Sequence, residues 1–409
     1  MVLGGGVIGL SIARAVSSSR RYEVFLLERN QRPGAATTSR NSGVIHAGLY
    51  YPPHSLKNRH CLQGKKSLVA YLQERNLPLN ICGKLVVATS SEEDATLDRI
   101  ASSCESNGLQ GLKNLTNPEV KSLYEPLVEC TKALFVPETA VFDVHSYVGS
   151  LERDCEENEV TFVYNCKFEK AAVNNSGNVR QFTISTNQGE LEADYFINAA
   201  GLEAPVIASQ IKEYPRNMVP KMYFAKGNYF KLSGSFKPFS RLVYPIPQEG
   251  GLGVHATIDA IDGSVRFGPD VEWLKCLIMK TEKDDDTTGT DEYLFHEVPN
   301  FEECGTYHVN EDKGEDFYAT IRSYFPTLKN GSLSPDYSGI RPKLVGPGGR
   351  SPSLVTTSSV ESRDLKDFVI EGECVHRIPG LINLYGIESP GLTSSLSIAN
   401  HVLQLLSRS

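Results

Sequence analysis

The chain has 409 residues, 40% of them apolar, and a formal net charge of −8. That length allows two or three domain-sized cores, and no run approaches the ~18 consecutive apolar residues of a membrane-spanning helix. The mild acidity, spread along the chain, argues against a nucleic-acid-binding surface, and an anionic substrate would need a local cationic pocket. The nine scattered cysteines form no CxxC pair. They are typical of buried or free thiols in a reducing compartment, and no metal site is expected.

A glycine-rich loop follows the first three residues and has the sequence GGGVIG, residues 4–9. Gly4 would allow a tight turn, Gly6 would let the backbone approach a pyrophosphate, and Gly9 would let the next helix pack close to the strand. A second apolar run ends at Glu28, which would accept hydrogen bonds from ribose hydroxyls. The order strand, loop, amphipathic helix, strand and acid predicts a dinucleotide-binding βαβ unit.

The first strand is short, because only Met1, Val2 and Leu3 precede the loop. A buried parallel strand usually has about five or six residues. We therefore expect a truncated N-terminus, and a truncation would also have removed any targeting peptide.

Further elements are predicted in chain order from periodicity and turn signals. Helices are predicted over about 56–74, 92–107 and 393–406, and strands over 84–89, 160–164, 181–186, 195–201, 367–370 and 381–386. Strand-like runs at 227–232, 241–246, 252–257 and 264–267 predict an antiparallel sheet, and the acidic segment 280–291 predicts a solvated, mobile loop. We expect a mixed α/β protein in which a Rossmann-like domain (1–78, 138–214 and 332–409) carries an inserted antiparallel-sheet substrate domain (79–137 and 215–331).

Four runs, at 39–53, 267–273, 336–344 and 383–396, resemble those of the FAD-dependent oxidoreductases of the D-amino-acid oxidase and glycine oxidase superfamily. Within it they are most similar to the L-2-hydroxyglutarate dehydrogenases; the segment from about 276 to 313 is longer than the family pattern. The resemblance implies FAD-dependent oxidation of L-2-hydroxyglutarate to 2-oxoglutarate, by hydride transfer from Cα to flavin N5. It also implies electron transfer to a quinone or other acceptor, a mitochondrial location and a membrane surface as a partner.

The resemblance also implies a set of cofactor contacts. Residues 39–42 would contact diphosphate and ribityl oxygens, the strand end at 199–201 would line the adenine side, and the start of the C-terminal helix would face the flavin pyrimidine edge. The expected cofactor-binding residues are Gly4, Gly6, Gly9, Glu28, Arg29, Ser39, Arg40, Asn41, Ser42, Ala200, Gly201, Gly386, Ser389, Gly391, Leu392 and Thr393.

Oxidising a 2-hydroxy acid requires a cation for the carboxylate and a base for the hydroxyl proton. Arg341 occupies the place of the superfamily's carboxylate-binding arginine, and its planar fork suits that role. His46 is the first choice for the base, because imidazole titrates near working pH and protonation near pH 6–7 would stop the reaction. His255 is the rival base or an additional anion ligand. Candidates for anchoring the distal carboxylate are Lys226, Lys343, Arg266, Tyr244 and Tyr223.

Two other functions remain open at this point. The first is an amine or amino-acid oxidase of the glycine or sarcosine oxidase type, with the same cofactor and fold. The second is a binding or structural protein whose first strand is too short to hold FAD.

Overall fold

A computed structural model describes residues 1–176, 179–247, 253–274, 301, 304–349 and 365–407. The predicted loop at 280–291 lies outside these residues. The described helices are α1 Val7–Ser18, α2 Leu56–Glu74, α3 Ser91–Ser106, α4 Asn117–Glu119, α5 Val144–Glu157, α6 Ala204–Ser209, α7 Gly314–Arg322, α8 Glu373–His376 and α9 Gly391–Leu406.

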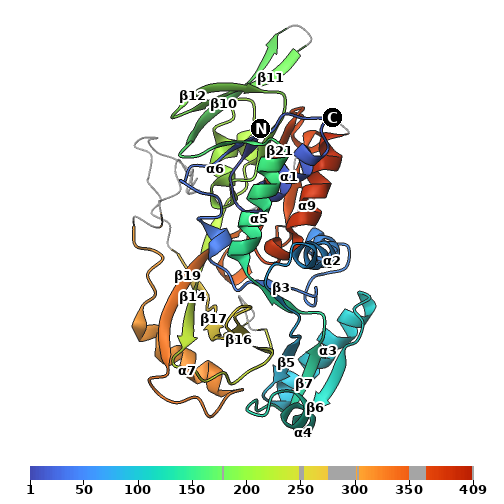
Figure 1. The fold of residues 1–409 in the computed structure, drawn as a ribbon, viewed down its shortest axis with the longest axis vertical. Coiled ribbons are helices and arrows are strands. Elements are labelled where there is room, and N and C mark those ends of the chain that lie inside the picture. The colour runs from blue at the N-terminus through green and yellow to red at the C-terminus, as the bar shows by residue number, and fades with distance from the viewer. Residues whose placement is uncertain (177–178, 248–252, 275–300, 302–303, 350–364, 408–409) are drawn as a thin grey trace, which may run out of the picture.

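A six-stranded sheet lies at one end of the molecule (Figure 1), in the order β20-β21-β13-β1-β2-β9. Its strands are β1 Val2–Leu3, β2 Phe25–Leu27, β9 Thr161–Val163, β13 Phe196–Asn198, β20 Val369–Glu371 and β21 Leu381–Tyr385. All neighbouring pairs are parallel except β20 and β21. The sheet thus joins three segments far apart in the sequence, as the discontinuous pattern predicted.

Alternation along these strands explains how the sheet is covered. Val2 and Leu26 point to one face, into a core with α1, α5 and α9, and Leu3 and Leu27 point to the other. That second face packs against α6 and a three-stranded sheet of β10 Phe168–Ser176, β11 Val179–Thr186 and β12 Gly189–Ala193. Because both faces are covered, the short central strand β1 is buried.

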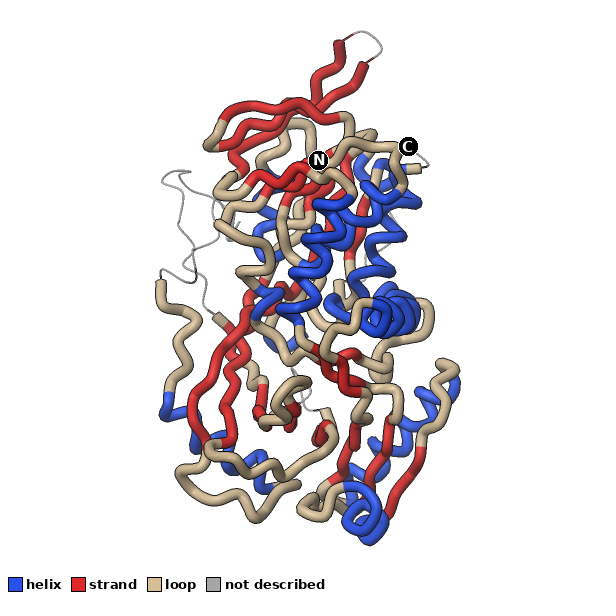
Figure 2. Tube along the Cα trace, in the orientation of Figure 1, coloured by secondary structure: helices blue, strands red, loops and turns tan. Residues whose placement is uncertain are grey.

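A nine-stranded sheet forms the other half of the molecule (Figure 2), in the order β18-β14-β17-β16-β15-β5-β7-β6, with β19 paired to β14. Its strands are β5 Lys84–Ala88, β6 Lys113–Thr116, β7 Lys132–Val136, β14 Tyr223–Leu232, β15 Leu242–Pro245, β16 His255–Ile258, β17 Val265–Gly268, β18 Glu272–Trp273 and β19 Leu333–Lys343. The expected antiparallel arrangement is found for β14 to β17, whereas β15 pairs with β5 in parallel.

One expected boundary differs from the structure. Residues from 332 onward were assigned to the Rossmann-like domain, but β19 pairs with β14 from Leu333 to Lys343 in the large sheet. Pro335 and Pro342 gave this segment no clear strand signal, because proline cannot donate to a ladder. β19 pairs with β14 alone, so its other edge requires no donors. The division into two domains otherwise remains our proposal.

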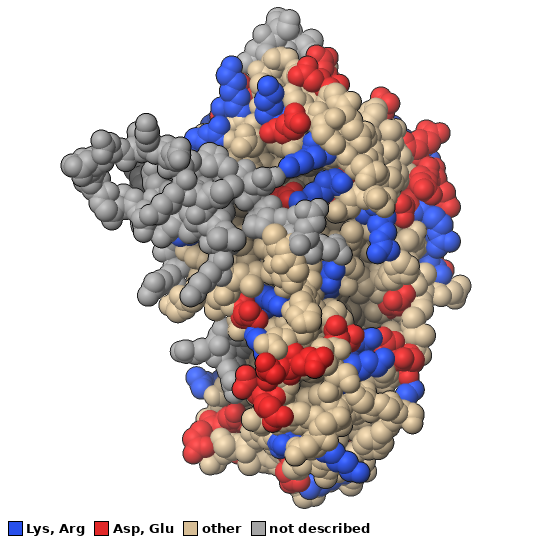
Figure 3. Space-filling model, turned by 90° about the vertical axis from the view of Figure 1, so that its left-hand side faces the viewer, with Lys and Arg blue, Asp and Glu red and all other residues tan. Residues whose placement is uncertain are grey.

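A small sheet, β3-β8-β4, joins the two halves and consists of β3 Val44–Ile45, β8 Ala140–Phe142 and β4 Leu79–Asn80. Both sequence and structure place α2 at 56–74, where the Ser55 side chain caps the helix by accepting from the Asn58 N–H. No helix in the described part of the chain is long and apolar enough to cross a bilayer. On the face shown in Figure 3, basic and acidic side chains are interspersed.

Candidate active site

A cavity of about 1450 Å³ extends from the glycine-rich loop to one face of the nine-stranded sheet. Its walls come from the start of α1, the end of β2, the loop 34–46, the turn after β13, strands β14, β16 and β19, and the segment that leads into α9. It therefore lies at the carboxyl ends of the parallel strands, where open α/β sheets bind ligands.

The glycine loop has the backbone geometry that close packing requires. Gly4 has a left-handed φ of +105°, and a Cβ there would lie 2.6 Å from the Ala199 carbonyl oxygen. A Cβ on Gly9 would collide with the Gly4 carbonyl oxygen, so this glycine lets α1 approach β1. Gly6 and Val7 then bring the first turn of α1 to the cavity wall, and the Val7 N–H donates to Thr38 Oγ1 at 3.0 Å.

Glu28 ends β2 at the cavity with its carboxylate held by the protein. Oε2 accepts from the Gly5 N–H at 2.7 Å, and Oε1 accepts from the Asn30 N–H at 2.8 Å. The next residue, Arg29, forms an ion pair with Glu203, and both line the same end. Ala200 and Gly201, which carry little or no side chain, line the cavity as well.

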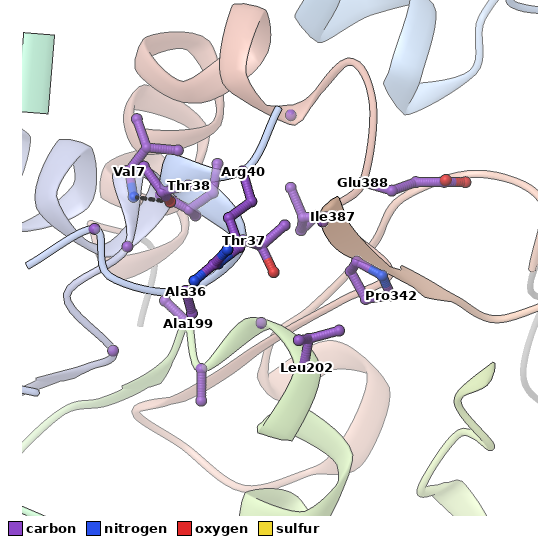
Figure 4. A pocket seen from close by; sticks show the side chains of 18 of the residues that line it. Val7, Ala36, Thr37, Thr38, Arg40, Ala199, Leu202, Pro342, Ile387 and Glu388 are labelled. Atoms are coloured by element: carbon purple, nitrogen blue, oxygen red, sulfur yellow. Dashed lines mark hydrogen bonds between the residues drawn. The ribbon is translucent and has the colours of Figure 1, made fainter. Parts of the chain in front are cut away.

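The loop 34–43 crosses the middle of the cavity. Figure 4 shows Val7, Thr37, Thr38 and Arg40 on one side, with Ala199 and Leu202 below them. Asn41 and Ser42 also line this wall. Ser39 does not. Its hydroxyl donates to the Ala35 and Ala36 carbonyls, and the residue faces a second cavity of about 330 Å³ behind the loop.

His46 borders the cavity near the start of α9. Its Nε2 is 3.3 Å from Ser389 Oγ, and its backbone N–H donates to Thr393 Oγ1 at 3.0 Å. Burial, followed by the charge of the Lys84 ammonium, lowers the pKa of His46 to about 3. The residue is only half-buried, because its accessible surface faces the cavity.

His255 lines the opposite wall and is 3% exposed. Its Nδ1 is 3.0 Å from the Gly253 carbonyl oxygen, which can only accept, so Nδ1 carries the proton and Nε2 keeps a lone pair. The ring stacks on Tyr244 with centroids 3.8 Å apart. Burial lowers the pKa of His255 to about 3. Both expected bases are thus neutral at pH 7.

Arg341 enters the cavity from β19. One guanidinium nitrogen, Nη2, donates to the Asp270 carbonyl at 2.7 Å and lies beside Gly227, where a Cβ would come within 2.8 Å of it. This contact orients the planar group while leaving its other donors for a ligand. A glycine at 227 is therefore needed for the guanidinium to pass.

The structure does not bring every expected anchor to the cavity. Gly227 lines it, so the adjacent Lys226 points to the opposite face of β14, where its ammonium donates to the His308 carbonyl at 2.6 Å. Lys343 lies beyond Arg341 and is paired with Glu388 at 2.8 Å. Arg266 is held by Asp259 and Asp336, and Tyr223 packs against Gly346.

The start of α9 closes the remaining side. Ser389, Gly391 and Leu392 line the cavity, whereas Thr393 is buried behind it and donates to the Val44 carbonyl at 3.2 Å. Gly386 lies outside the wall and makes the left-handed turn after β21, with a φ of +64°. The first turn of α9 therefore offers backbone N–H groups and a positive dipole end to the cavity.

The chain was compared with known proteins. A family model described as DAO, FAD dependent oxidoreductase, matches residues 1–405. The chain belongs to this family. It is similar to the mitochondrial L-2-hydroxyglutarate dehydrogenase of Arabidopsis thaliana, with 41% identity over 98% of this chain and 82% of the relative. L-2-hydroxyglutarate dehydrogenase of Indibacter alkaliphilus is 28% identical over 99% and 97% of the two chains.

Among solved structures, L-α-glycerophosphate oxidase from Mycoplasma pneumoniae with FAD bound superposes with a TM-score of 0.78, at 22% identity over 99% of this chain and 94% of that one. This similarity confirms the expected fold class of the DAO family. The expectation that these residues resemble the FAD-dependent superfamily is likewise confirmed by the family match.

Sequence reasoning missed three residues beside the cavity. Tyr229 donates to or accepts from Ser42 at 3.0 Å, and the half-buried Glu388 is the partner of Lys343 and Lys57. Lys84 lies behind Tyr244 and acts on both histidines. A lysine at the start of a strand usually faces solvent, so nothing in the local pattern indicated its burial.

Proposed function

We propose that this chain binds FAD and oxidises L-2-hydroxyglutarate to 2-oxoglutarate. The observation that carries the proposal is that one cavity is lined by the glycine loop with Glu28 at one end and by Arg341, His46 and His255 at the other. The 41% identity to a relative named for this activity supports the same substrate.

The residues present fit a flavin dinucleotide. The first turns of α1 and α9 are suited to the diphosphate and to the flavin pyrimidine edge. Gly4, which approaches the Ala199 carbonyl closely, places no side chain at that point of the wall. When bound, FAD would supply the acceptor for the hydride of the substrate Cα. The remaining steps are the work of protein side chains.

Arg341 would bind the α-carboxylate through donors that the Asp270 carbonyl leaves unused. His46 would accept the hydroxyl proton, because it is neutral and its accessible surface faces the cavity. His255, stacked on Tyr244 and nearly inaccessible, would hold the substrate's orientation through Nε2. Loss of the hydroxyl proton and of the Cα hydride together gives the ketone.

We extend the proposal to the electron acceptor, the membrane surface and the compartment. Electrons would pass to a quinone or another acceptor, with the protein at a membrane surface. The mitochondrial relative in Arabidopsis thaliana supports a mitochondrial location.

The test begins with the purified protein. We expect flavin absorbance, anaerobic bleaching by L-2-hydroxyglutarate, and 2-oxoglutarate as the product. The D-enantiomer is the matched control and should not bleach the flavin. Bleaching by glycine or sarcosine with release of ammonia or formaldehyde would instead assign an amine oxidase, and a protein without flavin would refute the proposal.

A further inference from the structure

Lys84 is a buried cation for which the described residues supply no anionic partner. It is 1% exposed, on β5, in register with Leu242 of β15 on one side and with Val136 of β7 on the other. Among the described residues its ammonium makes neither an ion pair nor a hydrogen bond. Its Nζ lies 4.6 Å from the centre of the Tyr244 ring and 5.4 Å from that of Tyr50, and the thiols of Cys104 and Cys61 are also nearby.

A buried ammonium without an anionic partner lowers the stability of the folded protein. Removing an ammonium from water is costly, and a cation–π contact offsets only part of that cost. Burial accordingly lowers the pKa of Lys84 to about 8, so the side chain is still charged at neutral pH. An anion bound in the cavity would balance part of this charge across Tyr244.

The hydroxyl groups around Tyr244 and Tyr50 have hydrogen-bonding capacity to spare. Tyr50 Oη is buried and lacks a partner in the described part of the chain. Tyr244 Oη and Thr257 Oγ1 are buried and have only each other, so one of their two O–H donors is unused there. Buried polar groups normally use their donors, so unused O–H donors in one region are consistent with a ligand-binding site. Of these residues, Tyr244 lines the cavity, and its ring lies beside both Lys84 and His255.

Lys84 and Arg341 are two separate positive charges at the histidine end. The charges of both act on His255, and Lys84 also acts on His46. Arg341 comes from β19 and Lys84 from β5, which stand at different positions in the nine-stranded sheet. A substrate held between them would have an anionic group at each end.

We propose that Lys84, acting through the hydroxyl of Tyr244, selects a dicarboxylate substrate by attracting the carboxylate distal to the hydroxyl-bearing carbon. Arg341 takes the carboxylate next to that carbon. The inference rests on the proposed function and names the residues that distinguish 2-hydroxyglutarate from a hydroxy acid with one carboxylate. Lys84 is a positioning residue, because Tyr244 stands between it and the cavity.

The experiment compares two ligands that differ by the distal carboxylate. Binding of 2-oxoglutarate and 2-oxobutyrate is followed by the change in flavin absorbance, and kcat and KM are measured for L-2-hydroxyglutarate and L-2-hydroxybutyrate. Lys84→Met should weaken the dicarboxylate roughly 10- to 100-fold in Kd and KM, with kcat and the monocarboxylate little changed. Tyr244→Phe, which keeps the ring, should weaken the dicarboxylate about 10-fold.

Two variants serve as controls. Lys226→Met removes another buried lysine of the same sheet, one that is turned away from the cavity, and should leave the ratio between the two ligands unchanged. Arg341→Lys should weaken both ligands. Bound flavin and the unfolding midpoint show whether each variant is folded.

Unchanged discrimination in folded Lys84→Met, or in Tyr244→Phe should Lys84→Met not fold, would overturn the inference. Equal weakening of both ligands would overturn it as well. A wild-type protein that oxidises neither hydroxy acid would refute the proposed function instead.

Discussion

His46 and His255 are held neutral by burial, which lowers the pKa of each to about 3. A neutral imidazole is the form that accepts a proton, so a lowered pKa extends the active form toward acid. The sequence alone suggested loss of rate near pH 6–7. Because both rings are buried, we expect this loss of rate at a lower pH.

We therefore expect flavin reduction by L-2-hydroxyglutarate to be independent of pH from about 5 to 7. The rate should decline only as the pH falls toward the lowered pKa of His46. Anaerobic stopped-flow bleaching measures this step without the electron acceptor. An acidic limb centred near the ordinary imidazole pKa would show that the catalytic base is not desolvated.

Replacing His46 distinguishes the proposed roles of the two histidines. His46→Asn should keep bound flavin and lower the rate of flavin reduction by roughly 10²–10⁴, the usual contribution of a general base. His255→Asn is the comparison and should mainly raise KM, because that ring is nearly inaccessible and stacked on Tyr244. The reverse pattern would transfer the role of base to His255.

At the scale of elements, the first helix depends on close contact with the first strand. Gly9→Ala would push a methyl group against the Gly4 carbonyl and should lower stability by about 1–3 kcal/mol. It should also reduce flavin content, because the start of α1 borders the cavity. Thermal unfolding and the ratio of flavin to protein absorbance measure both effects.

The control for this substitution is Gly149→Ala in α5. A Cβ there has open space around it, and alanine favours a helix by about 1 kcal/mol, so this variant should be as stable as the wild type or more so. A comparable loss of stability and flavin content in both variants would mean that the contact between α1 and β1 is not specially tight.

Local pattern was sufficient for some elements and not for others. Apolar periodicity predicted α2 over 56–74, and the glycine spacing predicted the turn into α1. The helix α5 was not predicted, although Asp143 caps it by accepting from the Ser146 N–H. The strand β19 carries two prolines, so only its partner β14 reveals it as a strand.

For the site, residue type predicted which chemistry a side chain could perform better than it predicted the face on which that side chain lies. Arg341 and both histidines were nominated from the sequence, and the structure brings them to one cavity. Lys226 was nominated for its charge but faces the other side of β14, whereas Lys84 was passed over. Which face a strand residue takes depends on tertiary pairing, which charge alone does not encode.

At the scale of the whole molecule, β19 of the nine-stranded sheet contacts both the loop 34–43 and the cavity. Gly339 of this strand lies directly against the Arg40 carbonyl of the loop that crosses the cavity, so closely that a Cβ would collide with it. Two residues farther along, Arg341 enters the histidine end. The cofactor loop and the substrate arginine therefore share one rigid support.

A shared support has a thermodynamic consequence, because any coupling between two ligands is reciprocal. If bound flavin orders the loop around Arg40 and thereby positions β19, flavin binding should raise the affinity for 2-oxoglutarate. Binding of 2-oxoglutarate must then raise the affinity for flavin by the same factor. We expect saturating 2-oxoglutarate to slow flavin release from the wild type, and Gly339→Ala to abolish most of this effect. Product would thus preserve the holoenzyme, so that a cell rich in 2-oxoglutarate would retain more of this protein in its flavin-loaded form.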